Sequence, residues 1–460
     1  MAILGLMTAE QLGATYRPKN IRRSVFYMYP NGSAPLIGLL SLMKEEVTND
    51  PEFKWYEKRM VEQRSTMAYI STTVAFHSVV DATWTTWTTA VANFSFTLGS
   101  QYGVQLAAGG TAQFRVGHII KFLAILNAGG TTEVHGRVTS VDSTNNRLAF
   151  ICSRASGVIL YTAAHLGFEV LAIGSAQAEG AASSTSTAGT GSGSTLEVYN
   201  TPVQPANFTE IFTANWQITG TAGKTAIWYD TRGVDPDLAK EASVNHNRNM
   251  EYAFIFGEKY ENVITPTNVT RHTGGVLYFL RLWEAGSTYG NTAATLDTDD
   301  TKRIIGNSSG ILSAKTYNKY LERFFRFNRN KQNEALCLCG NGFLNTLAEM
   351  YAGKQTFTSM MPADNTFGMK VTAHTTSFGT VYYKTHPLFN LNTTLLFNGL
   401  FLDVTCLKYR PLNGRDTTLR KNLQPNNADF VEDGWLTEAG LEVNSPESHM
   451  YIQNVTDWQP

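Results

Sequence analysis

The chain has 460 residues, of which 43% are hydrophobic and 12% aromatic, so it is long enough for two or three domains with a substantial core. Charged residues make up only 16%, against roughly 25% in average globular proteins. The formal net charge of −1 argues against a general electrostatic attraction to nucleic acid. Two explanations of the low charge remain open: much of the surface is buried against copies of the same chain, or a Thr-, Ser- and Asn-rich β protein has a neutral polar surface.

Residues 1–66 are predicted to form an arm. The arm contains the densest basic piece of the chain: Arg17, Lys19, Arg22 and Arg23. Ser33 as a cap and Pro35 in a first turn predict a helix start, and the apolar residues that follow keep helical spacing: Leu36, Leu39, Leu40, Met43 and Val47. No helical partner follows closely, so we expect this helix to bury its apolar stripe against a later domain or a neighbouring subunit.

The stretch TNDPEFKWYEKRM, residues 48–60, places three large aromatic residues among five charged ones after Pro51. A solvated helix does not need the aromatic residues, and a buried helix does not tolerate so much charge. Asp50-Pro51 is a helix-start signal, whereas Phe53 and Trp55 alternate as in a strand, so helix and strand both remain open.

The next part of the chain is rich in β signals. Residues 67–110 are rich in Thr, Val, Trp and Phe, which predicts long strands. Residues 111–178 contain short strand-like runs between close turn signals, the pattern of a small barrel or sandwich. The apolar set of this module is Val116, Ile119, Ile120, Phe122, Val138, Val141, Leu148, Phe150 and Val170. The Ala-, Ser-, Thr- and Gly-rich residues 179–199 predict a flexible loop.

Asp235-Pro236 begins the strongest predicted helix, which runs to about Tyr260 with Leu238, Ala242, Met250, Ala253 and Phe254 on one face. Further helices are predicted at 313–328 and 341–353. The chain returns to β character from residue 366.

Signs of chemistry are few. The nine histidines include no HExxH or zinc-type spacing and are interpreted as structural or surface residues. Cys152, Cys337, Cys339 and Cys406 lack CxxC spacing and are interpreted as reduced, buried thiols. Gly340-Asn341-Gly342 lacks the remainder of a phosphate-binding motif, so a plain strand–turn–helix junction is predicted. We therefore expect no enzyme activity, no cofactor and no metal. Without a clear signal peptide or an apolar stretch of membrane-spanning length, we expect a soluble protein made in the cytoplasm.

Several segments resemble the major capsid proteins of tailed bacteriophages with the Hong Kong 97-type fold. Residues 24–60 are similar to the arm of one large family of such proteins, with a Pro-Asn-Gly…Ala-Pro-Leu run followed by a DPEF-W signature. Glu179-Gly180, the run from Asn207 to Phe212 and Thr219-Gly-Thr-Ala resemble the family's return into the long helix. The end of the chain, from Trp435 to Val443, is also similar, so these pieces span nearly the whole chain in the expected order.

The resemblance implies an α+β fold with an inserted small β-barrel-like domain. Its parts map as an N-terminal arm (1–66), an extended loop called the E-loop (67–110 and 200–230), an inserted β domain (111–178), a flexible loop (179–199), a peripheral domain with the long helix (231–300 and 401–460) and an axial domain (301–400).

The function that the resemblance implies is a major capsid protein. Such a protein self-assembles into hexamers and pentamers of an icosahedral shell around double-stranded DNA, in the host bacterial cytoplasm. Its expected partners are other copies, a portal, scaffolding or decoration proteins and non-specifically packaged DNA, with no membrane. The alternatives are a phage tail or fibre protein that binds the host and, with less support, an unrecognised hydrolase.

Two groups of residues are expected to mediate contacts. Because arms in such shells lie across neighbouring subunits, an inter-subunit contact is predicted for Phe53, Trp55, Tyr56, Glu57 and Arg59. The basic piece Arg17, Lys19, Arg22 and Arg23 is predicted to face either the genome or an acidic neighbour.

Overall fold

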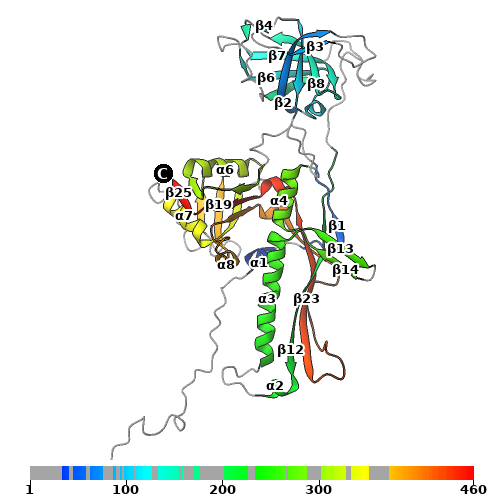
Figure 1. Cartoon of the computed structure of the whole chain (residues 1–460), viewed down its shortest axis with the longest axis vertical. Helices are drawn as coiled ribbons and strands as arrows, with labels where there is room; N and C mark the ends of the chain where they lie inside the picture. The colour runs from blue at the N-terminus through cyan, green and yellow to red at the C-terminus, as the bar shows by residue number, and fades with distance from the viewer. Residues whose placement is uncertain are drawn as a thin grey trace, which may run out of the picture.

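The computed structural model describes residues 34–40, 45–58, 63–75, 86–89, 94–95, 98–107, 109–126, 133–154, 158–159, 169–175, 201–225, 234–265, 268–286, 302–327, 333–351 and 372–459. Three parts follow one another along the long axis of the molecule (Figure 1). A β-barrel lies at one end, a sheet with helices lies in the middle, and a long helix beside a pair of long strands extends to the other end. The predicted flexible loop 179–199 lies outside the described residues.

The barrel is antiparallel and closed. Its strands follow the order β10-β6-β7-β8-β5-β2, and β10 pairs back onto β2. The bounds are β2 Arg64–Ala75, β5 Gln101–Leu106, β6 His118–Leu126, β7 Glu133–Asp142, β8 Arg147–Arg154 and β10 Glu169–Ser175. An ion pair of 2.9 Å between Arg64 and Glu169 crosses the closing seam. Smaller elements accompany these strands: β3 Thr86–Thr89 beside β2, the pair β4 Phe94–Ser95 and β9 Val158–Ile159, and the 3-10 helix η1 Gly110–Gln113.

The barrel is larger than the module predicted from the sequence. Strands β2 and β5, which the sequence assigned to the E-loop range 67–110, lie in the same sheet as β6, β7, β8 and β10. The module therefore spans residues 64–175 and does not begin at residue 111. The boundary was wrong because the pairing of β5 with β8 and of β2 with β10 is non-local, and turn signals do not reveal it. The predicted apolar set is largely correct, since its buried members fill one core: Ile120, Phe122, Val138, Leu148, Phe150 and Val170.

The second part consists of the long helix α3 (Val234–Phe256) packed along two long antiparallel strands, β12 (Glu210–Thr219) and β23 (Phe430–Val443). The two strands are far apart in the sequence, and the β12–β23 pair is called the hairpin below only for its shape. Alternation along β12 places Phe212, Trp216 and Ile218 in buried positions, and Ile211 is exposed. Trp216 Nε1 donates to Asp235 Oδ1 at 2.9 Å, which fixes the start of α3 on the hairpin. Both β21 (Leu407–Pro411) and β22 (Thr418–Arg420) pair with β23, and α2 (Gly220–Lys224) follows β12.

The third part is a six-stranded sheet in the order β15-β24-β20-β17-β19-β18. The bounds are β15 Ile304–Gly306, β17 Glu334–Cys339, β18 Thr372–Thr375, β19 Thr380–Thr385, β20 Gly399–Leu402 and β24 Met450–Gln453. Helices α6 (Ala314–Arg326) and α7 (Asn341–Tyr351) confirm the predicted helices, and α7 follows β17 directly through the predicted turn at Gly340. Strand β16 (Ile311–Ser313) follows β15 in the chain, and β25 (Asp457–Gln459) follows β24; these two short strands form a separate parallel pair. The resemblance assigned the whole range 401–460 to the peripheral domain. In the structure this range is divided, because β24 and the end of β20 belong to the six-stranded sheet, whereas β21 and β22 pair with β23 beside α3.

The arm helix is shorter than predicted among the described residues. Helix α1 spans Pro35–Leu40, and Glu45 to Val47 have no helical structure. Val47 is 53% exposed, so it does not continue the apolar stripe. Instead, the Glu46 and Thr48 amides donate to the carbonyls of Tyr409 and Pro411 in β21, because pairing with an existing strand edge satisfies the backbone without a helix.

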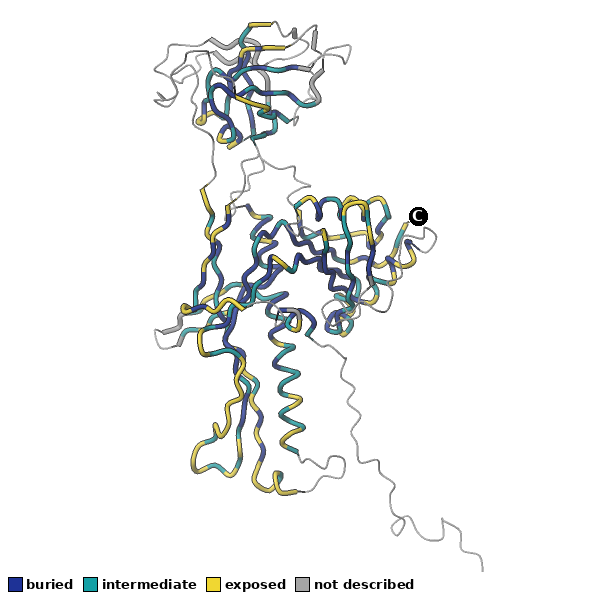
Figure 2. The backbone as a smooth tube through the Cα atoms, turned by 180° about the vertical axis from the view of Figure 1, so that it is seen from behind, coloured by how far each residue is buried: buried dark blue, intermediate teal, exposed yellow. Residues whose placement is uncertain are grey.

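One hydrophobic core joins the arm, the helix–hairpin part and the six-stranded sheet. It contains Leu36 and Leu40 of α1, Phe254 of α3, Leu400 of β20 and Leu441 of β23. The core of the barrel is a separate cluster. Figure 2 shows buried backbone concentrated where the arm, α3 and the sheet meet, while the far end of the hairpin is mostly exposed.

Candidate functional site

The stretch from Pro51 to Lys58 is extended, which decides between the two secondary structures that the sequence left open. Strand β1 (Glu52–Lys54) pairs antiparallel with β11 (Ala206–Phe208), and Glu57 forms a further bridge with Val203. Side chains along a strand alternate between two faces, so one stretch can be both apolar and charged. Phe53, Trp55 and Glu57 are buried on one face, whereas Lys54, Tyr56 and Lys58 are exposed on the other.

The inward face packs into the chain's own core. The Phe53 ring lies 5.3 Å from the Arg410 guanidinium, and a Cβ at Gly440 would lie 2.6 Å from a Phe53 ring carbon, so only glycine fits there. The Trp55 ring lies 5.5 Å from that of Phe279 in α4 (Val276–Ala285).

Glu57 completes this inward face. Its Oε1 accepts hydrogen bonds from Trp55 Nε1 at 2.9 Å and from the Ser445 amide at 3.1 Å. Phe53, Trp55 and Glu57 are between 3% and 7% exposed within their own chain, and their contact with a neighbouring subunit stays a prediction. Sequence reasoning missed this burial because it had no means of finding the partner strands β11 and β23.

The outward face retains one of the predicted contact residues. Tyr56 is 73% exposed, and its contact with a neighbouring subunit remains a prediction. Arg59 and the basic residues Arg17, Lys19, Arg22 and Arg23 lie outside the described residues.

An ionic network fastens the start of this segment to β21 and β23. Glu46 lies 2.6 Å from Lys408 and 2.8 Å from Arg410, and Glu442 lies 3.6 Å and 3.3 Å from the same two cations. The hydrogen bond from Lys408 lowers the pKa of Glu46, and the same bond raises the pKa of Lys408. Because Glu46 and Lys408 are largely exposed, we expect this network to contribute more to register than to stability.

A second anchor lies at α1, around a fully buried carboxylate. Glu251 of α3 accepts hydrogen bonds from the amides of Leu36 (2.8 Å, to Oε1) and Ile37 (2.9 Å, to Oε2). His386 Nε2 lies 2.8 Å from Oε1, and the side chains of Glu251 and His386 are both 0% exposed. Because His386 Nδ1 accepts the Leu388 amide at 3.2 Å, its proton resides on Nε2 and is donated to Glu251.

Helical spacing predicted Met250 and Phe254 on the apolar face of the long helix, but it did not reveal this anchor at Glu251, which lies between them in the sequence. The available signal was an acidic residue next to that apolar face. A carboxylate buried there requires hydrogen-bond donors, so its position indicates that other segments pack against the helix at this point. The interpretation of the histidines as structural or surface residues suits His386, which caps α8 (Pro387–Asn390).

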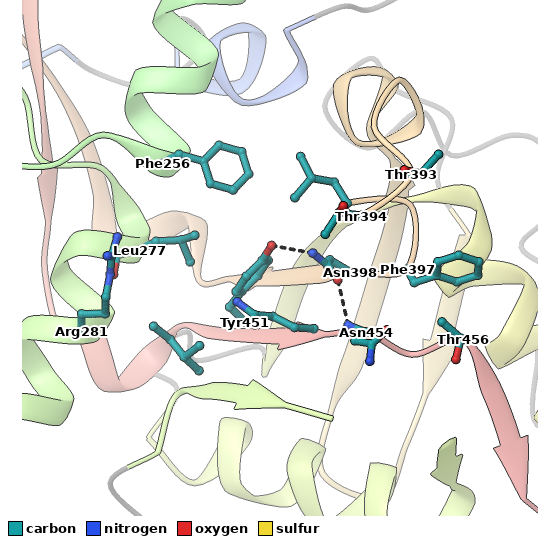
Figure 3. Close-up of a pocket in the computed structure, with 13 residues that line it drawn as sticks. Phe256, Leu277, Arg281, Thr393, Thr394, Phe397, Asn398, Tyr451, Asn454 and Thr456 are labelled. Carbon is teal, nitrogen blue, oxygen red and sulfur yellow. Dashed lines mark hydrogen bonds between the residues drawn. The ribbon is translucent and has the colours of Figure 1, made fainter. Parts of the chain in front are cut away.

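A cleft of about 750 Å³ lies beside this anchor, between the end of α3, helix α4 and the six-stranded sheet (Figure 3). Phe256, Leu277 and Tyr451 give it apolar walls. Asn398 donates to the Tyr451 hydroxyl at 2.9 Å and accepts the Asn454 amide at 2.8 Å, as the dashed lines in Figure 3 show.

Among the described residues, no group of three or more His, Cys, Asp or Glu side chains is placed to hold a metal ion. Within the same residues, no helix combines the length and the hydropathy needed to cross a membrane.

No curated protein matches the chain. The capsid of cyanophage A-1(L) is similar at 11% identity, covering 62% of this chain and 85% of that chain with a TM-score of 0.39. The SrpI encapsulin of Synechococcus elongatus PCC 7942 is similar at 8% identity, covering 57% and 79% with a TM-score of 0.35. The capsid of the myovirus phage XM1 is similar at 12% identity, covering 59% and 80% with a TM-score of 0.35.

The sequence model of one family, described as SU10 major capsid protein, matches residues 8–456. This match confirms the resemblance to a major capsid protein with the Hong Kong 97-type fold, and it selects the shell protein over the tail or fibre alternative. A head shell consists of repeated copies, so the protein is a homo-oligomeric component of the virion. The chain belongs to the SU10 major capsid protein family and is a major capsid protein that forms a phage head shell.

Proposed function

We propose that this protein assembles as hexamers and pentamers into an icosahedral shell that encloses the double-stranded DNA of a tailed phage. Assembly takes place in the host bacterial cytoplasm, and the copies contact one another through the hairpin of β12 and β23 and through the outward face of residues 52–58. Portal, scaffolding or decoration proteins complete the head, and the packaged DNA is held without sequence specificity.

The observation that carries this proposal is a group of exposed apolar side chains near the far end of the hairpin. Val431 is 41% exposed, Leu419 39% and Leu423 40%. The Leu423 amide donates to the Glu432 carbonyl, and Leu419 pairs with Trp435, so backbone pairing gathers the three residues along β23. Exposed apolar residues that gather on one extended element are typical of an interaction surface.

The parts of the chain receive the following roles in this proposal. The arm, up to about residue 63, and α3 with the hairpin form the arm and the peripheral domain. The six-stranded sheet with α6 and α7 forms the axial domain. The barrel of residues 64–175 occupies the position of the E-loop and its insertion, where it contacts a neighbouring copy or docks a decoration protein.

Electron microscopy of the expressed protein tests the proposal. We expect closed shells, tubes or rings of hexamers for the unchanged protein, and we expect V431K to remain unassembled because a buried lysine at a repeated contact is unfavourable. The matched control is I311K, since Ile311 on β16 is 44% exposed and lies outside the proposed contacts, and this variant should assemble. Trimeric rods from the unchanged protein, or normal shells from V431K, would contradict the proposal.

A further inference from the structure

The buried carboxylate of Glu251 connects three parts of the molecule that are far apart in the sequence. Glu251 belongs to α3, its two amide donors belong to the arm helix α1, and its third donor is His386. His386 follows β19 of the six-stranded sheet directly and begins α8. One side chain therefore contacts the arm, the peripheral helix and the axial sheet.

The three donors support one another because they share a charge that has no access to water. A fully buried carboxylate is unfavourable unless hydrogen bonds compensate its lost hydration. If α1 leaves, Glu251 loses two of the three donors that the described residues supply. The hydrogen bond from His386 then remains, and it does not by itself compensate the buried negative charge of Glu251. If His386 moves away, the carboxylate that holds α1 is weakened in the same way. Such mutual dependence is a coupling free energy, and it acts equally in both directions.

The geometry also lets α1 detach without the rest of the arm. Helix α1 has six residues, and it contributes Leu36 and Leu40 to the core. The following described segment is held independently, by the amides of Glu46 and Thr48 on β21 and by the pairing of β1 with β11. Release of α1 therefore breaks the Glu251 contacts while the anchor at residues 45–58 stays in place.

There is room for movement next to this junction. Phe256, five residues beyond Glu251, packs its ring 6.0 Å from that of Phe389 in α8 and also lines the cleft of about 750 Å³ (Figure 3). The cleft separates the end of α3 and α4 from the loop before β20, so the axial sheet has space to turn toward α3 and α4.

We propose that Glu251 is a coupling residue, through which docking of α1 locks the axial sheet onto the peripheral helix and release of α1 frees it to turn. The arm then controls the position of the six-stranded sheet relative to α3, in addition to anchoring the chain. A contact that draws the N-terminal arm away during assembly would change the angle between the axial and peripheral parts of the same subunit.

Hydrogen exchange measured by mass spectrometry on unassembled full-length protein tests this coupling. In E251Q the side-chain amide directs a donor group at the Leu36 or Ile37 amide, so one arm contact is lost while the shape is kept. We expect exchange to rise about ten- to a hundredfold, the effect of losing a hydrogen bond to a charged group, in α1 and also in 386–402. The matched control is H246Q, because His246 is a buried histidine on the same helix that bonds Thr437 at 2.7 Å and does not contact Glu251. It should change neither segment.

A second variant tests the coupling without altering the charge. L36A/L40A weakens the docking of α1 and leaves Glu251 and His386 unchanged, yet it should raise exchange at 386–402. H386Q should conversely raise exchange in α1. If L36A/L40A loosens α1 alone, or if H386Q leaves α1 protected, the three parts are not coupled and the proposal is overturned.

Discussion

The barrel and the rest of the molecule bury their cores in different ways. The barrel core is built from one continuous range, between Met67 and Val170, and the strands at its seam pair with each other. A second large core draws on residues from Leu36 to Tyr451, so it is formed jointly by the arm, the long helix, the β12–β23 pair and the sheet. A third core lies between the same sheet and the helices α6 and α7. The difference indicates that the barrel is an autonomous module, whereas the body depends on the arm being docked. A destabilising substitution in the barrel should therefore loosen the barrel alone, whereas one at the arm should loosen the other elements of the body as well.

The largest effect is expected for W55A, which removes an indole from the body core. Burial at 7% exposure predicts a loss of about 3–5 kcal/mol of unfolding free energy, and Glu57 also loses one of its donors. Chemical denaturation followed by circular dichroism measures this loss. The control is Y56A, next in sequence but exposed, which should change stability by less than about 0.5 kcal/mol and impair assembly instead. Normal stability of W55A would show that Trp55 is not part of the core.

The barrel counterpart is F150A. Phe150 is fully buried, its ring lies 5.0 Å from that of Phe122, and its removal should cost about 3–5 kcal/mol within the barrel. Limited proteolysis with mass spectrometry should find new cuts only inside residues 64–175, while α3 and the six-stranded sheet stay protected. New cuts across the body would contradict the autonomy of the barrel.

Acid should destabilise the body, because burial lowers the pKa of three of its histidines. Burial lowers the pKa of His246 and His374, and it lowers the pKa of His449 to about 4. The unfolded chain binds a proton at about pH 6.5, so unfolding takes up protons, and stability falls as the pH drops from about 6.5 to 4. For His449 alone the loss is roughly 3 kcal/mol.

Unfolding free energies measured at pH 7 and pH 4.5 check this expectation. H449N retains an acceptor for the Asp403 amide, which His449 Nδ1 accepts at 3.2 Å, and it should show a shallower dependence on pH. The exposed H272Q serves as the control and should keep the slope of the unchanged protein. An equal slope in H449N would refute the assignment to His449.

The smallest effect is expected for E46Q, which weakens the ionic network of the arm. Exposed ion pairs contribute about 0.2–1 kcal/mol each, and less at high salt. The unfolding free energy of E46Q should differ by about this amount at low salt and should approach that of the unchanged protein at 1 M salt. A larger, salt-independent loss would mean that Glu46 is part of the core and not of a surface register contact.

The sequence by itself determined features that depend on neighbouring residues. The Asp235-Pro236 start and its apolar spacing predicted α3, and the helices α6 and α7 and the apolar set of the barrel were read correctly from period and turn signals. The order of weak motifs along the chain was sufficient to suggest the family. These features were accessible because helix spacing and strand alternation are local consequences of backbone geometry.

Only the tertiary structure decided the features that depend on distant partners. Strand β5 belongs to the barrel because β8 pairs with it, and β24 belongs to the six-stranded sheet because β20 pairs with it. Phe53 and Trp55 turn inward because β11 and β23 form the surface that receives them, and Glu251 is tolerated in the core because α1 and His386 supply donors. Strand pairing and the satisfaction of buried polar groups are non-local, so no pattern within a short window of sequence determines them.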